Sequence, residues 1–151
     1  GYSAQVALAT NSNQVRIGDA SVTKADIQVA WTITSDARYK KDIQNLPASL
    51  PLIQALRPVV YKRVNDDNPL RVENGFIAQE VEATLQKMGL ATEGIISKDD
   101  KGFYGVRYND FIPVLVKGIQ EQQKNIEAQE QKISDLQKQI DELKKLIGSR
   151  N

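Results

Sequence analysis

The stretch IPVLVKGIQEQQKNIEAQEQKISDLQKQIDELKKLI, residues 112–147, decides the fold of this chain, because its isoleucines recur at every seventh position. In a heptad lettered abcdefg these isoleucines occupy position a, and leucine or glutamine occupies position d. The a positions are Ile112, Ile119, Ile126, Ile133, Ile140 and Ile147, and the d positions are Leu115, Gln122, Gln129, Leu136 and Leu143. A heptad that is sustained for about five repeats predicts a long helix that associates with other helices as a coiled coil.

The length of this helix favours association with other chains. At about 1.5 Å per residue it is on the order of 50 Å long, which is more than a small domain can cover. The alternative is an amphipathic helix that folds back on its own domain. The seam that we expect to hold the coiled coil together consists of Ile119, Ile126, Ile133, Leu136, Ile140 and Leu143.

The number of helices in the coiled coil is less clearly encoded than its existence. Isoleucine at a with leucine at d favours two strands, but the glutamines at two d positions weaken that preference. The e and g positions carry no complementary charge code, which favours identical chains over a mixed assembly. The heptads alone therefore leave dimer and trimer open.

The composition divides the 151 residues into three parts. After Pro113 the chain contains no further Pro and no Trp, Phe or Tyr, so the C-terminal part differs from the mixed sequence before it. We predict an α+β fold with three regions: short strands that end a β-rich structure at 1–34, a small mixed α/β head at 35–108, and the coiled-coil helix at 109–151.

The charge balance and the missing residue types argue against several classes of function. Lys and Arg total 20 against 19 Asp and Glu, so the formal net charge of +1 gives no basic field that attracts nucleic acid. Cysteine and histidine are absent, which removes disulfides, thiolate nucleophiles and the usual zinc ligands. No apolar run approaches the roughly 20 residues of a membrane helix. We therefore expect no metal, cofactor, nucleic-acid or membrane partner.

Residues 27–33 alternate in polarity as a strand does. Ile27, Val29, Trp31 and Ile33 share one face and polar or small residues share the other, which is the pattern of a half-buried strand. Short strands bury too little to be stable alone. We expect this strand to end a larger β structure or to pair with other chains, and an ordinary N-terminal sheet of the same domain is the alternative.

Helix and strand patterns alternate between residues 35 and 108. Turn chemistry separates them, because Asn and Asp bond their own backbone and Pro69 blocks a helix. The predicted elements are a helix over 48–56, a strand over 59–64, a turn over 65–69, a strand over 75–77, a helix over 79–88 with Val81 and Leu85 on one face, and a hairpin over 95–106. Asn109 or Asp110 is placed to cap the long helix.

The segment TSDARYKKDI, residues 34–43, places a hydroxyl and an amine five residues apart at the end of the predicted strand. A serine is a poor nucleophile until a base takes its proton, and without histidine that base must be Lys, Asp or Glu. Lys40 is the candidate base for Ser35. The Ser35 hydroxyl can attack the Thr34 carbonyl through a five-membered ring, which converts the amide into an ester that water then opens.

Charged neighbours decide whether Lys40 can act in this way. A lysine is a base only in its neutral form, which burial or neighbouring cations favour. Arg38, Lys41 and Arg57 are expected to contribute such like-charge pressure. Asp36 and Asp42 are expected to oppose it. Taken without other signals, a solvated lysine beside a helix-capping serine is the ordinary interpretation of this spacing.

Four blocks of sequence, in order, add a signal of a different kind. They are SDARYKKDI at 35–43, LRP at 56–58 with Tyr61, GFIAQEV at 75–81, and Tyr108 with IPVLVKGIQE at 112–121. Together they resemble the intramolecular chaperone domain, or peptidase S74 family, found at the C-termini of phage tailspikes, tail fibres, neck appendages and endosialidases. The resemblance covers the chain from Ser35 to Asn151, including the terminal coiled coil.

The resemblance implies a specific function. The family's domain forms a homotrimer, holds three fibre chains in register while their upstream β structure winds, and releases itself by autoproteolysis before a serine. Here the implied cut lies between Thr34 and Ser35, and the implied Ser/Lys dyad is Ser35 and Lys40. The chain would thus be a self-cleaving serine peptidase that acts once, in cis.

The resemblance also implies partners and a place in the infected cell. The partners are two further copies of the chain and the upstream fibre or tailspike. Assembly and release occur in the host cytoplasm, and the upstream part stays in the virion. A permanent structural or receptor-binding fibre tip that is never cut is the alternative. Related domains also occur in membrane-tethered transcription factors, a context that the missing basic patch argues against.

Three residues near these motifs are candidates for supporting roles. Asp36 directly follows the nucleophile. Gln79 and Glu80 begin the predicted helix, where they would form bonds near the dyad or across a subunit contact. A simpler role for Glu80 is to stabilise the helix N-terminus through its charge. The charged run at 98–102 is typical of a solvated hairpin turn and resembles a metal loop only superficially.

Overall fold

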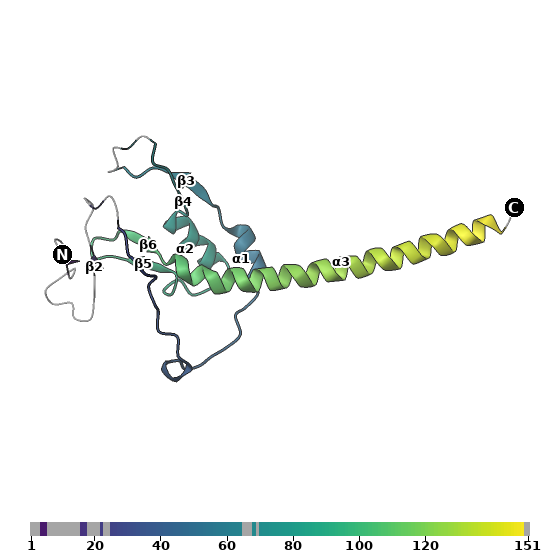
Figure 1. Ribbon diagram of the computed structural model, residues 1–151, viewed down its shortest axis with the longest axis horizontal. Helices are drawn as coiled ribbons and strands as arrows, with labels where there is room; N and C mark the ends of the chain where they lie inside the picture. The colour runs from purple at the N-terminus through teal and green to yellow at the C-terminus, as the bar shows by residue number, and fades with distance from the viewer. Residues whose placement is uncertain are drawn as a thin grey trace.

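The computed structural model describes residues 4–5, 16–17, 22, 25–64, 68 and 70–149. Figure 1 shows a small head of short helices and hairpins, from which one long helix projects. The elements are β1 (Ala4–Gln5), β2 (Arg16–Ile17), the 3-10 turn η1 (Ala37–Tyr39), α1 (Leu50–Ala55), β3 (Val59–Tyr61), β4 (Glu73–Gly75), α2 (Ala78–Lys87), β5 (Ile96–Lys98), β6 (Tyr104–Val106), η2 (Tyr108–Asp110) and α3 (Phe111–Gly148). This combination confirms the predicted α+β class.

The described strands form three separate antiparallel pairs, β1 with β2, β3 with β4 and β5 with β6. In the second pair Val59 lies opposite Gly75, and in the third Ile96 lies opposite Val106. Each pair joins strands that follow one another along the described chain, so these strands pair locally and form no larger sheet with one another. The hairpin predicted over 95–106 is confirmed.

Asp99 shapes the turn of that hairpin. Its side-chain Oδ1 accepts hydrogen bonds from the backbone N–H groups of Lys101 and Phe103, at 2.9 Å each. Gly102 has a positive φ of 79°, a conformation that glycine adopts without steric strain. The charged run is therefore a turn that its own aspartate organises, as predicted.

The core lies where α1, α2, β5 and the first turns of α3 meet. Val81 and Leu85 share one face of α2, as their four-residue spacing predicts, and both are almost fully buried. Burial of one such side chain stabilises a fold by about 1.5–3 kcal/mol. The buried apolar cluster consists of Leu52, Ala78, Val81, Leu85, Ile96, Phe111 and Val114.

One side of the first turns of α3 packs on the head. We call Phe111, Val114, Gly118 and Glu121 the head stripe, and the first three of these residues are buried. Gly118 lets α1 approach closely, because a Cβ at this position would overlap the side chain of Ile53. The head is therefore fixed to the helix by α1.

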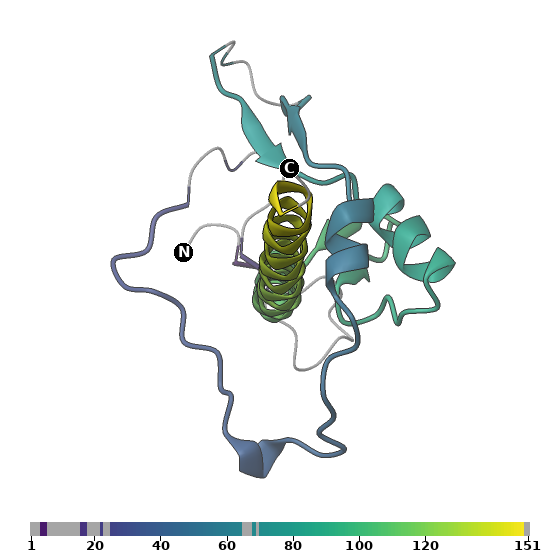
Figure 2. The same cartoon turned by 90° about the vertical axis from the view of Figure 1, so that its right-hand side faces the viewer.

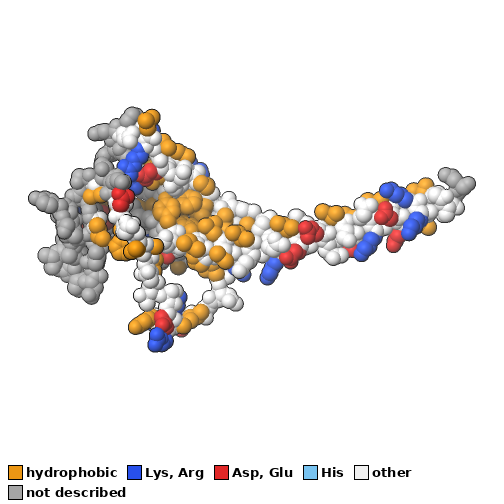
Figure 3. Space-filling view, viewed as in Figure 1, with side chains coloured by type: hydrophobic (Ala, Val, Ile, Leu, Met, Phe, Trp, Pro, Cys, Tyr) orange, Lys and Arg blue, Asp and Glu red, His pale blue; other side chains and the backbone are white. Residues whose placement is uncertain are grey.

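A second stripe of α3, consisting of the a and d positions of the heptad, begins one residue after the head stripe. One residue is about 100° around a helix, so packing against the head leaves this heptad stripe free. Ile119 and Ile133 in the stripe are 68% and 65% exposed. Figure 3 shows apolar side chains along the projecting helix, and Figure 2 looks along its length. The helix does not fold back on its own head, so that alternative is wrong for this chain.

The strand predicted over 27–33 is not formed. None of residues 25–36 is in a strand, and Val29 and Trp31 are 77% and 71% exposed. A strand requires a neighbour for its backbone hydrogen bonds, and no described strand pairs with this segment. The alternating apolar side chains are consequently uncovered within one chain.

The other predicted elements are found with small shifts. The helix predicted over 48–56 is α1, the strand over 59–64 is β3, and the helix over 79–88 is α2. The strand expected at 75–77 lies slightly earlier as β4, because Ile77 already occupies the N-cap position of α2. Most of the turn predicted over 65–69 lies outside the described residues.

The start of α3 differs from the predicted cap. Asp110 occupies the N-cap position but makes no side-chain capping bond. Its carboxylate instead pairs with the Arg107 guanidinium at 2.9 Å. A nearby guanidinium offers a charged partner, which binds a carboxylate more strongly than a backbone N–H does.

Candidate functional site

The two residues predicted to act together meet in the structure. Lys40 Nζ donates a hydrogen bond to Ser35 Oγ at 2.7 Å. This is the geometry that a nucleophile and its base require. Lys40 can act as that base only as a neutral amine, whose lone pair accepts the proton of Oγ.

A short turn brings Ser35 and Lys40 together. Asp36 caps the 3-10 turn η1, and its Oδ1 accepts a hydrogen bond from the backbone N–H of Arg38 at 2.8 Å. The backbone N–H of Tyr39 donates to the Asp36 carbonyl, and that of Lys40 donates to the carbonyl of Ala37. The chain thereby reverses direction, and the Lys40 side chain returns toward Ser35.

Arg38 binds the same carboxylate with its side chain. Its Nε donates to Asp36 Oδ1 at 3.0 Å, and its second terminal nitrogen donates to Oδ2 at 2.7 Å. The side-chain hydrogen bonds from Arg38, assisted by its backbone N–H, lower the pKa of the Asp36 carboxyl below its usual range. We expected Arg38 to act on Lys40 through its charge, but its guanidinium is engaged by Asp36.

The site is open to solvent in a single chain. Ser35 and Lys40 are both exposed, and η1 contacts no other described helix or strand. Figures 1 and 2 show the segment that bears η1 standing away from the head. The water-free surroundings in which a lysine loses its proton readily are therefore missing from the described part of one chain.

Gln79 and Glu80 lie on the first turn of α2 and are not brought to this site. Glu80 is bound to Arg57, whose Nε donates to Glu80 Oε2 at 3.0 Å. The Arg57 side-chain hydrogen bond lowers the pKa of Glu80, and that bond in turn raises the pKa of Arg57. Gln79 is exposed on the same turn. Glu80 thus joins the α2 N-terminus to the segment after α1.

Tyr108, which belongs to the fourth sequence block, contacts the third block, and the second block packs beside them through Tyr61. The Tyr108 hydroxyl accepts a hydrogen bond from the backbone N–H of Phe76 at 3.0 Å, and the two rings are stacked with centroids 6.0 Å apart. A Cβ at Gly75 would overlap the Tyr108 hydroxyl and press on the Tyr61 ring. The last three blocks are therefore held together in the head, whereas the first block lies apart from them.

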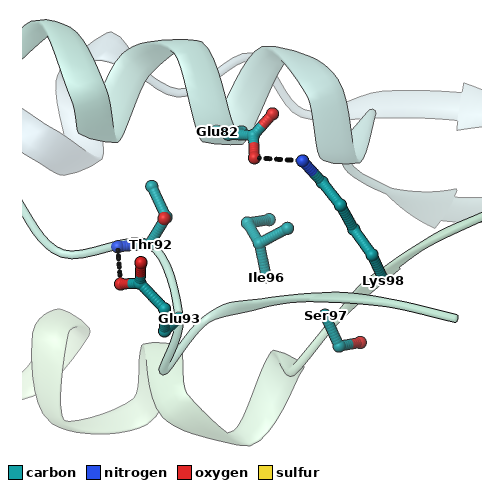
Figure 4. Close-up of a pocket in the computed structure, with 6 residues that line it drawn as sticks. All are labelled: Glu82, Thr92, Glu93, Ile96, Ser97 and Lys98. Atoms are coloured by element: carbon teal, nitrogen blue, oxygen red, sulfur yellow. Dashed lines mark hydrogen bonds and ion pairs between the residues drawn. The ribbon is translucent and has the colours of Figure 1, made fainter. Parts of the chain in front are cut away.

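A hollow between α2 and β5 contains no nucleophile paired with a base like that of Ser35 and Lys40. It has a volume of about 480 Å³ and is lined by Glu82, Thr92, Glu93, Ile96, Ser97 and Lys98 (Figure 4). Glu82 pairs with Lys98 at 2.9 Å and accepts a hydrogen bond from the Tyr104 hydroxyl at 3.0 Å. The Lys98 ammonium also lies 4.4 Å from the centre of the Tyr104 ring. These charged groups satisfy one another and fasten the hairpin to α2.

Neither a metal-ligand cluster nor a membrane-spanning helix is found among the described residues. No group of three or more Asp, Glu, His or Cys in this part of the chain is arranged to hold a metal ion. None of the helices in it combines the length and apolar character of a membrane span, and α3 carries charges throughout.

Two comparisons with known proteins bear on the site. Residues 35–90 match the model of the peptidase S74 family, described as chaperone of endosialidase. The match begins at Ser35, the residue after the predicted cut, and it confirms the resemblance for the blocks up to GFIAQEV. No curated protein matches the chain.

Proposed function

We propose that this chain, whose residues 35–90 are a segment of the peptidase S74 family, is an intramolecular chaperone that trimerises, registers upstream fibre chains and cuts itself between Thr34 and Ser35. The observation that carries the proposal is the 2.7 Å contact between Lys40 Nζ and Ser35 Oγ at the first residue of the family match. In this proposal residues 1–34 are the end of the fibre, residues 35–108 are the chaperone head and residues 109–151 are the coiled-coil helix.

The exposed heptad stripe supports the trimerising part of the proposal. Seven of its side chains beyond the head are large, apolar and more than a third exposed, which is unfavourable for an isolated helix in water. They are Ile119, Ile126, Ile133, Leu136, Ile140, Leu143 and Ile147. Association with identical helices buries these side chains.

The uncovered segment before Ser35 supports the registering part. Its apolar face, including Val29 and Trp31, lacks a strand partner among the described residues. Pairing between chains has a high contact order and is slow, so clamped helices that raise the local concentration of three such segments accelerate it. Removing the clamp afterwards leaves the wound product kinetically trapped.

The cleavage chemistry follows from the atoms that meet at the turn. Neutral Lys40 Nζ takes the proton of Ser35 Oγ while Oγ forms a bond to the Thr34 carbonyl carbon. The carbon–nitrogen bond breaks, the Ser35 nitrogen takes up a proton, and an ester remains. Water then hydrolyses the ester, which leaves a carboxylate on Thr34, a free amine on Ser35 and the original hydroxyl.

Assembly provides the desolvation that one chain lacks. The proposal requires that a neighbouring copy cover η1 in the trimer, because exclusion of water favours the neutral form of a lysine. Cutting is therefore linked to completed assembly, because an isolated chain keeps its dyad hydrated. This order suits a chaperone that must stay attached until its substrate has wound.

The test combines sedimentation with mass spectrometry of the chain. We expect a trimer, together with two products that end at Thr34 and begin at Ser35. A Ser35→Ala variant serves as the control and stays intact as the same trimer. A stable monomer at micromolar concentration would refute the chaperone, and an intact trimeric wild type after prolonged incubation would favour the alternative of a permanent fibre tip.

A further inference from the structure

The turn that joins Ser35 to Lys40 is held by few interactions. Five extended residues would separate the two Cα atoms by about 17 Å, more than a lysine side chain can bridge. The described hydrogen bonds of η1 lie within residues 36–40, and η1 touches no other described helix or strand. The fraction of molecules in which the two side chains meet therefore depends on local bonds.

The Asp36 carboxylate provides most of those bonds. One of its oxygens accepts hydrogen bonds from the backbone N–H and the Nε of Arg38, at 2.8 and 3.0 Å. The other accepts from Nε at 3.2 Å and from the terminal nitrogen at 2.7 Å. A bidentate guanidinium–carboxylate pair combined with an N-cap is among the stronger arrangements that an exposed turn can have.

The pairing of Arg38 with Asp36 also determines which group accepts a hydrogen bond from Lys40. Asp36 is the residue next to Ser35, and an ammonium binds a carboxylate more strongly than it binds a hydroxyl. Because Arg38 occupies both carboxylate oxygens, Lys40 is left to the Ser35 hydroxyl. An unpaired carboxylate at this position would draw Lys40 away from the nucleophile and stabilise its protonated form.

We propose that Asp36 and Arg38 are positioning residues for self-cleavage: Asp36 closes the turn, and Arg38 both reinforces it and withholds the Asp36 carboxylate from Lys40. This proposal rests on the proposed self-cleavage between Thr34 and Ser35. It assigns Arg38 a specific task that its residue type explains, since a lysine at 38 has one compact charge and cannot occupy two carboxylate oxygens in parallel.

The proposal predicts an unusual relation between two variants. Arg38→Ala frees the carboxylate, so the first-order cleavage rate falls about tenfold and its midpoint moves to higher pH. Asp36→Asn keeps an oxygen that can cap the turn and removes the negative charge. The cleavage rate therefore falls by about threefold to fivefold, and its pH midpoint does not move upward. In the Arg38→Ala background, however, Asp36→Asn raises the rate, because no carboxylate remains to compete for Lys40.

The experiment measures cleavage of the assembled chain on denaturing gels between pH 6 and 10. It includes the wild type, both single variants, the double variant and Arg38→Lys, with sedimentation to establish that each is assembled. Arg63→Ala is the matched control, because Arg63 is an exposed arginine that also pairs with a carboxylate, that of Glu73, far from Ser35. We expect the control to cut like the wild type and Arg38→Lys to fall between wild type and Arg38→Ala.

The outcomes separate this proposal from the proposed function. If the wild type does not cut, self-cleavage itself fails. If the wild type cuts, and Arg38→Ala cuts at the same rate with the same pH midpoint, the positioning role is overturned while self-cleavage stands. If Asp36→Asn lowers the rate equally in both backgrounds, the pair acts only as a structural brace and the competition for Lys40 is refuted.

Discussion

Glu121 in α3 caps α1 from a distance of 71 residues, because its Oε2 accepts a hydrogen bond from the backbone N–H of Leu50 at 2.9 Å. The same oxygen accepts a second bond from the N–H of Ser49 at 3.0 Å. These N–H groups belong to a helix end that has no side-chain cap of its own. The contact joins the long helix to the head through one carboxylate.

We predict that Glu121→Ala lowers the melting temperature of the head at pH 7 and that Glu121→Gln lowers it less. The alanine leaves two backbone donors without an acceptor, whereas the glutamine amide oxygen still accepts one of their bonds. Thermal unfolding followed by circular dichroism checks the order of the three proteins. Glu130→Ala is the control, because Glu130 lies on the exposed part of the same helix and should behave like the wild type.

The Glu121 contact also predicts a pH dependence. The backbone hydrogen bond from Leu50, the largest favourable cause, lowers the pKa of Glu121 in the folded state. A group whose pKa is lowered on folding stabilises the fold above its unfolded value of about 4.3, and that stabilisation is lost as the pH falls through the folded value. The gap in melting temperature between wild type and Glu121→Gln should therefore narrow below about pH 4. A constant gap from pH 7 to pH 3 would contradict this account.

Gly75 and Tyr108 give a second stability prediction. Gly75→Ala should destabilise the head by about 1–3 kcal/mol, because the new Cβ overlaps a hydroxyl that its bond to Phe76 holds in place. The same change should be less harmful in a Tyr108→Phe background, where the obstructing oxygen is gone. Denaturant unfolding of the four proteins measures this coupling, and equal losses in both backgrounds would show that the hydroxyl is not the obstacle.

The heptad stripe can be tested at one position. Ile133→Asp should weaken self-association by at least about tenfold, since burying the seam would then require burying a carboxylate. The head should remain folded, because Ile133 is 65% exposed and lies well beyond the head stripe. Sedimentation at several concentrations is the measurement. Ser134→Asp adds the same charge one residue off the seam and should assemble normally.

The dyad prediction concerns cutting without loss of assembly. Ser35→Ala and Lys40→Ala should each leave the chain uncut while sedimenting like the wild type, because the turn that holds them contacts no other described element. Lys101→Ala is the matched control and should cut normally, because Lys101 is an exposed lysine in the turn of the β5–β6 hairpin. A Lys40→Ala chain that is cut at the wild-type rate would remove this lysine from the mechanism.

The sequence predicted correctly those features of the structure that depend on residues close together along the chain. The seven-residue repeat predicted α3, and the spacing of Val81 and Leu85 predicted the buried face of α2. The contact of Ser35 with Lys40 was predicted from the family resemblance of the segment that contains them, because their five-residue spacing alone is ordinary. In each case the interaction lies within one turn or one helix, so the physical cause is contained in a short window of sequence.

The contacts that sequence reasoning missed join distant segments or follow from competition between partners. The bond from Glu121 to α1 and the pair of Arg57 with Glu80 depend on how the elements pack, which no short window contains. The pairing of Arg38 with Asp36 could have been predicted from their two-residue spacing. We instead expected the charge of Arg38 to act on Lys40. The strand expected over 27–33 requires a pairing partner, and none of the described strands pairs with this segment.

The offset between the head stripe and the heptad stripe of α3 has a practical consequence for building chimeras. A donor helix that is joined after Glu121 has to begin at the matching heptad position for the proposed coiled coil to form. One extra residue would rotate every later side chain by about 100° around the helix axis. If α3 forms the proposed coiled coil, deletions or insertions after Glu121 should be tolerated in whole multiples of seven residues and should disrupt assembly otherwise. In the proposed coiled coil, the rotation of each head about the bundle is therefore set by the heptad position at which α3 leaves the head.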